Sequence, residues 1–165
     1  KMPIRTIHAA FIHRLFPNAK FLFAERHPCD VVLSNFMQNY AINEAMIHFT
    51  RIDSAVETYD RIMRLWQRTL ETLPELPVHS VRYEKLLEDP EATLRAACGF
   101  LGLPWQSGLQ EHRESLAQRG SIKTNSYHQV AEPLYQRSKY RWQNYREHLQ
   151  PHLPTLQYHI ERMGY

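Results

Sequence analysis

The sequence has few of the residues that define several classes of protein. Its 165 residues include two cysteines and five scattered glycines. Two cysteines outside any CxxC pair make no disulfide framework, and they favour a reducing compartment. The glycines form neither a GxGxxG nor a GxxxxGK[ST] motif, and no GxSxG or Ser-His-Asp signature is present. A conventional P-loop and a hydrolase triad within these residues therefore have no support.

Charge of one sign and long apolar runs are also scarce. The net charge is +3 at pH 7 with neutral histidines, which is too small to indicate a nucleic-acid partner and suits a protein that handles an anionic small molecule. No stretch approaches 18 apolar residues and no signal peptide is visible, so no membrane segment is expected. The chain begins at Lys1-Met2-Pro3, which indicates a piece of a longer protein. Its length and 43% apolar content predict one globular domain.

Hydrophobic periodicity predicts helices that alternate with two short strands. The strands are expected over 20–25 and 78–83, and such alternation implies a parallel sheet covered on both faces. Two strands are few for that fold, so either others are unrecognised or the first part of the fold lies upstream. The segment 120–138 is long for a passive connection and is expected to be functional or disordered. Helices are expected over 4–16 (with Ile4, Ile7, Phe11, Ile12, Leu15 and Phe16 on one stripe), from Pro28, over 51–73, from Asp89 to Gly102, over 107–119 and over 138–163, with interruptions at Pro151 and Pro154.

Arg26 follows the first strand, at the edge where parallel sheets bind ligands and helix N-termini present N–H groups. Its planar fork can pair with two phosphate oxygens. Ser34, in the second turn of the next helix, can add a hydroxyl donor. The simpler alternative is an ion pair between Arg26 and Asp30 with a solvent-facing Ser34, and taken alone these residues favour it.

Three further places offer candidate ligand contacts. Tyr83 ends the second strand, where its ring could lie against a nucleobase or belong to the core. Ser126 and Gln129 belong to the polar segment 120–138. Lys139 opens a predicted helix, where its charge opposes the helix dipole unless an anion is shared; its alternative is a solvated lysine at a frayed end.

A metal site is not expected. His148 and His152 have i, i+4 spacing, but Pro151 interrupts the helix that would align them, and no third ligand is suitably placed.

Three stretches, in order, resemble sulfotransferases that use 3′-phosphoadenosine 5′-phosphosulfate (PAPS). They are KMPIRTIHAAFIHRLFPNAKFLFAERHPCDVVLSNFMQNY (1–40), VRYEKLLEDPEATLRAACGFLGLPW (81–105) and NSYHQVAEPLYQRSKYRWQNYREHL (125–149). The spacing of RLFPNAKFLF with the following Arg, Asp and Ser is most similar to the tyrosylprotein sulfotransferases and to bacterial tetratricopeptide-linked relatives. The resemblance implies a P-loop-NTPase-like three-layer α/β sandwich with a parallel sheet. Residues 1–165 would be the C-terminal portion of a single such domain, without its N-terminal strand and 5′-phosphosulfate loop.

The resemblance assigns roles to individual residues. Arg26 and Ser34 match the pair that grips the 3′-phosphate, and Tyr83 matches a tyrosine that contacts the adenosine. Lys1 matches the lysine that stabilises the transferring sulfuryl group and the leaving phosphate. Ser126 matches the start of the C-terminal cofactor loop and Lys139 matches the lysine after it, and Gln129 lies between them. Gln38 stands where the tyrosylprotein enzymes carry an arginine, which leaves one phosphate contact unassigned.

The implied activity is transfer of a sulfuryl group from PAPS to an acceptor hydroxyl on a tyrosine, a carbohydrate or a small alcohol, releasing 3′-phosphoadenosine 5′-phosphate without a metal. The general base would lie upstream of Lys1, so this chain alone is expected to be inactive or weak. The expected compartment is the cytoplasm, or the Golgi lumen if an anchor precedes the chain; a homodimer is compatible with this. The alternatives are a nucleotide kinase-like phosphotransferase, which needs ATP and magnesium, and a non-catalytic binding module.

Overall fold

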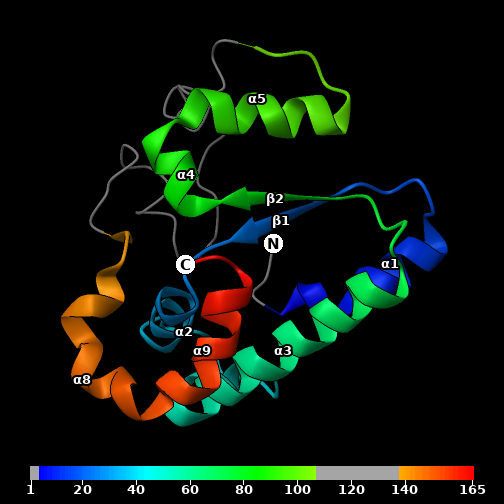
Figure 1. Ribbon diagram of the computed structural model, residues 1–165. Helices are drawn as coiled ribbons and strands as arrows, with labels where there is room; N and C mark the ends of the chain where they lie inside the picture. Colours follow the sequence, from blue (N-terminus) through cyan, green and yellow to red (C-terminus); the bar gives the residue numbers. More distant parts are fainter. Residues whose placement is uncertain (1–3, 107–137) are drawn as a thin grey trace. The chain divides into compact units, whose positions relative to one another are not determined.

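The computed structural model describes residues 4–106 and 138–165 of the chain. The elements fall into two compact units (Figure 1). The helical unit comprises Lys1–Phe21, Arg26–Val78 and Tyr140–Tyr165, and the sheet unit comprises Leu22–Glu25 and His79–Lys139. In chain order the elements are η1 (Arg5–His8), α1 (Ala9–Leu15), β1 (Phe21–Glu25), α2 (Pro28–Phe36), η2 (Met46–Phe49), α3 (Ile52–Thr72), β2 (Val78–Arg82), α4 (Tyr83–Glu88), α5 (Pro90–Leu101), η5 (Arg141–Tyr145), α8 (Arg146–Leu149), η6 (Gln150–His152) and α9 (Leu153–Arg162).

The long helix α3 is the central element of the helical unit. Its apolar side chains recur at helical spacing, which places one stripe in the core. The helix ends at Thr72 because Leu73 precedes a proline, and the residue before a proline disfavours helical backbone. The helix expected over 51–73 is therefore confirmed. Its buried apolar residues are Ala55, Val56, Tyr59, Met63 and Trp66.

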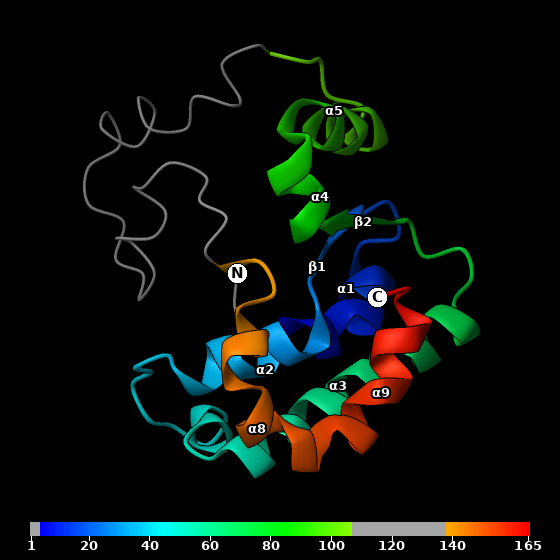
Figure 2. The same ribbon diagram turned by 60° about the vertical axis from the view of Figure 1, so that its left-hand side comes forward.

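Of the C-terminal helices, α9 packs against both α3 and α2 and completes this core (Figure 2). Leu149, Leu156 and His159 have no exposed surface. Pro154 lies in the first turn of α9, where the missing N–H of proline costs no hydrogen bond. The expected interruption at Pro154 is therefore wrong, because this proline begins a helix. Pro151 lies in the short 3₁₀ turn η6 that precedes it.

The first helical segment differs from the expectation for 4–16. It begins as the 3₁₀ turn η1 and continues as α1, so the number of residues per turn changes within the segment and no single stripe runs along it. Phe11, Leu15 and Phe16 are 64%, 55% and 63% exposed, whereas Ala9 is buried. The stripe predicted over 4–16 is therefore not a buried face.

The sheet consists, among the described residues, of the parallel neighbours β1 and β2, whose arrows point the same way in Figure 1. Where the strands begin, the Phe21 N–H donates to the Pro77 carbonyl at 2.9 Å. Where they end, Arg82 Nε donates to Glu25 Oε1 at 2.6 Å. The α/β class with parallel strands is thereby confirmed, while the three-layer P-loop-like arrangement stays a prediction. The second strand ends one residue earlier than expected.

Helix α5 has capping residues at both ends. Asp89 Oδ1 accepts the Ala92 N–H at 2.9 Å and Pro90 occupies the first position, which are favoured helix starts. Gly102 ends the helix with φ of 77°, a conformation that glycine adopts without steric cost. These ends confirm the helix expected from Asp89 to Gly102. The helix expected over 107–119 lies outside the described residues, as does the segment 120–138 apart from its last residue.

Candidate functional site

The junction between β1 and α2 places Arg26 directly after the carboxyl end of a parallel strand. Pro28 opens α2, and the preceding His27 caps it by accepting the Cys29 N–H on Nδ1 at 3.3 Å. A guanidinium nitrogen of Arg26 lies 3.4 Å from Asp30 Oδ2 in an i, i+4 ion pair. The Arg26 side chain is 19% exposed and the Asp30 side chain is fully buried. The ion pair named as the simpler alternative is thus present.

Asp30 also holds the C-terminal segment. Its Oδ1 accepts the backbone N–H of Trp142 at 2.8 Å, although the two residues are 112 positions apart. Burial raises the pKa of the Asp30 carboxyl, and the Arg26 charge and the Trp142 N–H only partly offset that effect. Asp30 was expected only as a helix-start residue and as a partner of Arg26. Its bond to Trp142 could not be found from local spacing.

Aromatic rings surround His27, the residue between Arg26 and α2. The Trp142 ring stacks on the imidazole with centroids 4.9 Å apart and an interplanar angle of 14°. Tyr140 and Tyr165 contact it edge-on at 5.8 and 5.0 Å. Tyr140 has φ of 52°, a left-handed conformation uncommon for a non-glycine residue. The C-terminal segment is therefore fixed to the start of α2 by packing as well as by a hydrogen bond.

Ser34 lies one turn beyond Asp30 on the same side of α2, since residues four apart on a helix are neighbours. Its side chain is exposed. Gln38 follows the end of the helix and is partly buried, with its backbone N–H donating to the Asn35 carbonyl at 3.2 Å. In contrast to Ser34, Cys29 at the start of α2 has no exposed surface, and burial raises the pKa of its thiol to about 12. That thiol is therefore a packing group rather than a nucleophile.

The other predicted site residues belong to the sheet unit or lie outside the described part of the chain. Tyr83 is the partly buried first residue of α4. Lys139 precedes η5 instead of opening a helix, and its Nζ lies 2.5 Å from Glu88 Oε1. The expected conflict between Lys139 and a helix dipole is therefore wrong. The hydrogen bond from Lys139 lowers the pKa of Glu88. Lys1, Ser126 and Gln129 lie outside the described residues.

A pocket of about 380 Å³ in the sheet unit offers a further polar surface. The ion pair between Glu25 and Arg82 lies in its wall, so these two charges partly satisfy each other. The remaining lining residues are His79, Ser80, Lys85, Thr93 and Ala96.

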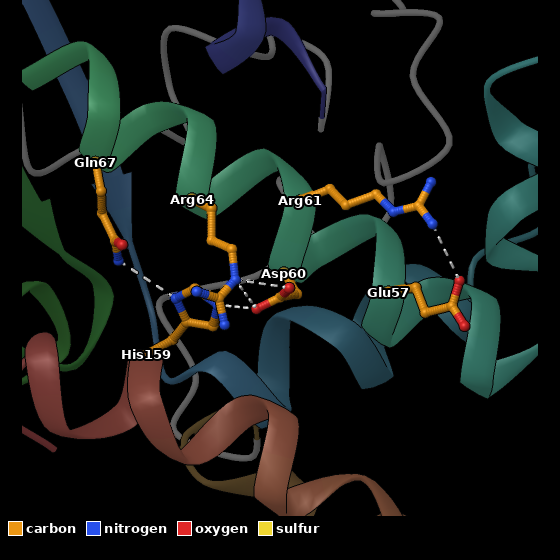
Figure 3. Close-up of polar contacts among 6 residues, drawn as sticks. All are labelled: Glu57, Asp60, Arg61, Arg64, Gln67 and His159. Atoms are coloured by element: carbon orange, nitrogen blue, oxygen red, sulfur yellow. Dashed lines mark hydrogen bonds and ion pairs between the residues drawn. The ribbon is translucent and has the colours of Figure 1, made fainter.

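A second polar cluster joins α3 to α9 in the helical unit (Figure 3). The buried His159 lies with Nε2 2.8 Å from Asp60 Oδ1 and Nδ1 3.3 Å from Gln67 Nε2. Arg64 Nε donates to both Asp60 oxygens at 2.9 Å. Burial raises the pKa of Asp60, but the hydrogen bonds from Arg64 and His159 outweigh it, so the net shift is downward. Sequence reasoning missed this cluster, because Asp60 and His159 are 99 positions apart.

Neither metal binding nor membrane insertion finds support in the described ranges. Within residues 4–106 and 138–165, no group of three or more His, Cys, Asp or Glu residues could hold a metal ion. None of the helices described there is long and apolar enough to span a bilayer.

Comparison with known proteins identifies the family. A family model described as the sulfotransferase family matches residues 1–107. A protein-tyrosine sulfotransferase of Drosophila melanogaster is 26% identical over 153 residues, which cover 86% of this chain and 29% of that protein. An omega-hydroxy-beta-dihydromenaquinone-9 sulfotransferase of Mycobacterium bovis is 31% identical over 140 residues, covering 80% of this chain and 36% of that protein. An uncharacterized Aquifex aeolicus protein is 28% identical over 161 residues, covering 95% of this chain and 20% of that protein.

The chain belongs to the sulfotransferase family, as the sequence motifs predicted. It spans between a fifth and about a third of the length of these three relatives. The two named relatives act on different acceptors by their names, so membership of the family does not by itself define an acceptor.

Proposed function

We propose that this chain provides the 3′-phosphate and adenosine half of a PAPS site in an enzyme that transfers a sulfuryl group to an acceptor hydroxyl. The observation that carries the proposal is the position of Arg26, a partly exposed guanidinium directly after a parallel strand and at the start of a helix. Ligands of α/β sheets bind at this edge, and helix N-termini favour anions there.

The residues present fit a phosphate group. Arg26 offers a planar fork that matches two phosphate oxygens, and the exposed Ser34 lies in the second turn of α2, the helix that follows Arg26. An Arg side chain has five N–H donors, so one guanidinium can contact both Asp30 and a phosphate. Bound PAPS supplies the sulfuryl group, while the chain binds and orients the nucleotide. A site built for a doubly charged substituent also discriminates against nucleotides that lack it, because Arg26 then makes only its contact with Asp30 and loses those with the phosphate.

Further roles complete the proposal. Tyr83 would contact the adenosine, and Ser126, Gln129 and Lys139 would close on the nucleotide from the C-terminal side. Lys139 would then exchange its contact with Glu88 for the ligand. Lys1 would place a cation near the sulfuryl and bridging oxygens, where charge stabilisation contributes most to such a transfer. The acceptor would be a hydroxyl on a tyrosine, a carbohydrate or a small alcohol.

The first prediction tests Arg26. Arg26→Ala should weaken the affinity for 3′-phosphoadenosine 5′-phosphate by about 3 kcal/mol, roughly a hundredfold, because two charge-assisted contacts are lost. Isothermal titration calorimetry measures the affinity, and a melting curve checks that the variant folds. Adenosine 5′-phosphate serves as a second ligand, and its affinity should change little because it has no 3′-phosphate.

Arg95→Ala is the matched control, since Arg95 also pairs with a carboxylate four residues away, Glu91 at 2.5 Å, but lies in α5. It should bind both nucleotides as the wild-type protein does. Equal affinity of wild type and Arg26→Ala for the 3′-phosphorylated nucleotide would refute the assignment of Arg26.

A further inference from the structure

The carboxylate of Asp30 is shared by two groups from opposite ends of the chain. One oxygen lies 3.4 Å from the Arg26 guanidinium, and the other accepts the Trp142 N–H at 2.8 Å. The side chain has no exposed surface. Burying a carboxyl group costs free energy unless it has polar partners. Removal of one partner therefore leaves the remaining buried polar groups without a full set of contacts.

The contacts around Trp142 make its position dependent on the same end of α2. Its ring stacks on His27, which directly follows Arg26. The chain turns into this contact through the left-handed Tyr140, which directly follows Lys139. The indole Nε1 of Trp142 is buried and has no hydrogen-bond partner among the described residues. The polar contact described for Trp142 is therefore that of its backbone N–H with Asp30. The bond to Asp30 therefore helps to define where the C-terminal segment begins.

We propose that Asp30 is a positioning residue of the phosphate site, which orients the Arg26 guanidinium and anchors the segment from Tyr140 through the Trp142 N–H. This inference rests on the proposed function, in which Arg26 binds the 3′-phosphate. A long arginine side chain loses rotamer freedom when it contacts a ligand, and this loss weakens binding. Because Asp30 already holds the Arg26 side chain, less freedom remains to be lost. Asp30 also places a carboxyl near an anionic ligand, which by itself would weaken binding. The two effects have opposite signs, so an uncharged substitute distinguishes them.

The experiment compares Asp30→Asn with Asp60→Asn. In Asp30→Asn the amide oxygen can still accept the Trp142 N–H, whereas the ion pair with Arg26 is lost. The affinity for 3′-phosphoadenosine 5′-phosphate, measured by calorimetry, should fall about tenfold, the value of one charge-assisted contact. Asp60 is matched because it too pairs with an arginine four positions away and contacts the C-terminal segment. Asp60→Asn should bind within about twofold of the wild type, because the partners of Asp60, Arg64 and His159, are not among the proposed nucleotide contacts.

A second measurement needs no ligand. Hydrogen exchange followed by NMR on protein with ¹⁵N-labelled tryptophan reports the backbone amides of Trp66, Trp105 and Trp142 separately. Asp30→Ala should accelerate exchange at Trp142 only, because its acceptor is removed. Asp30→Asn should retain that protection. Equal exchange at Trp142 in wild type and Asp30→Ala would overturn the anchoring role.

The outcomes separate this inference from the proposed function. If Arg26→Ala binds the 3′-phosphorylated nucleotide as the wild type does, the proposed function has failed. If Arg26→Ala binds weakly but Asp30→Asn binds equally well or more tightly than wild type, the function stands and the positioning role is overturned. Should Asp30→Asn not fold, Asp30→Glu replaces it. This variant retains the charge but displaces the carboxylate by one methylene, so wild-type affinity in it would equally overturn the positioning role.

Discussion

Two aspartates of the helical unit have the same local chemistry and different surroundings. Asp30 pairs with Arg26 and Asp60 pairs with Arg64, each with a partner four residues away in the sequence. The C-terminal part of the chain bonds to both, through the Trp142 N–H at Asp30 and through His159 at Asp60. Near-identical pairs thus occur at the start of α2 and within α3.

The surroundings decide what each pair does. At Asp60, both Arg64 and His159 donate to the carboxylate, and Gln67 contacts the second imidazole nitrogen, so the cluster is closed. At Asp30, the Arg26 contact is a longer ion pair at 3.4 Å, and burial dominates the pKa. The pKa shifts accordingly have opposite directions. The Asp60 cluster is closed and joins α3 to α9. The Asp30 cluster is looser, and its partly exposed Arg26 can contact a second anion.

Among changes to the two aspartate clusters, His159→Ala should have the largest effect on stability. The change removes a fully buried side chain and its contacts with Asp60 and Gln67, so the free energy of unfolding should fall by about 3 kcal/mol. Urea denaturation measures this change, and the exposed His148→Ala is the control. Affinity for 3′-phosphoadenosine 5′-phosphate, measured where the variant remains folded, should not change. A loss of stability below about 1 kcal/mol would contradict a structural role for the closed cluster.

A smaller effect should appear in the dependence of stability on pH. Asp60 has a folded-state pKa below its usual 3.8, so its favourable contribution is present above pH 3.8 and is lost as the pH falls through the lower value. Asp30 has a raised pKa, so its favourable contribution is present below pH 3.8 and is lost as the pH rises through the higher value.

The unfolding free energies of wild type, Asp60→Asn and Asp30→Asn, measured from pH 7 down to the acid limit of folding, test these signs. The advantage of wild type over Asp60→Asn should shrink as the pH falls below 3.8. The difference between wild type and Asp30→Asn should move in favour of wild type as the pH falls toward 3.8 from above. Differences that change in the same direction for both variants would remove the contrast between the two clusters.

The smallest effect on stability should come from Arg64→Met. This change removes a mostly exposed partner of Asp60. His159 still donates to the carboxylate, and exposed ion pairs contribute little to stability. The melting temperature should therefore change much less than in His159→Ala. A loss as large as that of His159→Ala would show that Arg64, rather than the buried imidazole, holds the Asp60 cluster together.

Local sequence patterns predicted most elements and only part of the site. The strands around 20–25 and 78–83, the proline at the start of α2 and the long helix α3 follow from short-range periodicity and capping. The exposed face of α1 was not predicted, because periodicity does not show whether a stripe meets a partner. The pairing of Arg26 with Asp30 was weighed from its spacing of four. The contacts of Asp30 with Trp142 and of Asp60 with His159 join residues about a hundred positions apart, so no local pattern indicates them.

The discontinuous make-up of the helical unit has a consequence for synthesis on the ribosome. Leu149, Leu156 and His159 have no exposed surface in this unit, and they are translated well after α3. The partners of His159 on α3, Asp60 and Gln67, are made more than ninety residues earlier. A nascent chain that stops before residue 149 therefore leaves the apolar stripe of α3 without this cover. Native packing of the unit must wait until the end of α9 has emerged, and in that interval the stripe is a surface that a chaperone could bind.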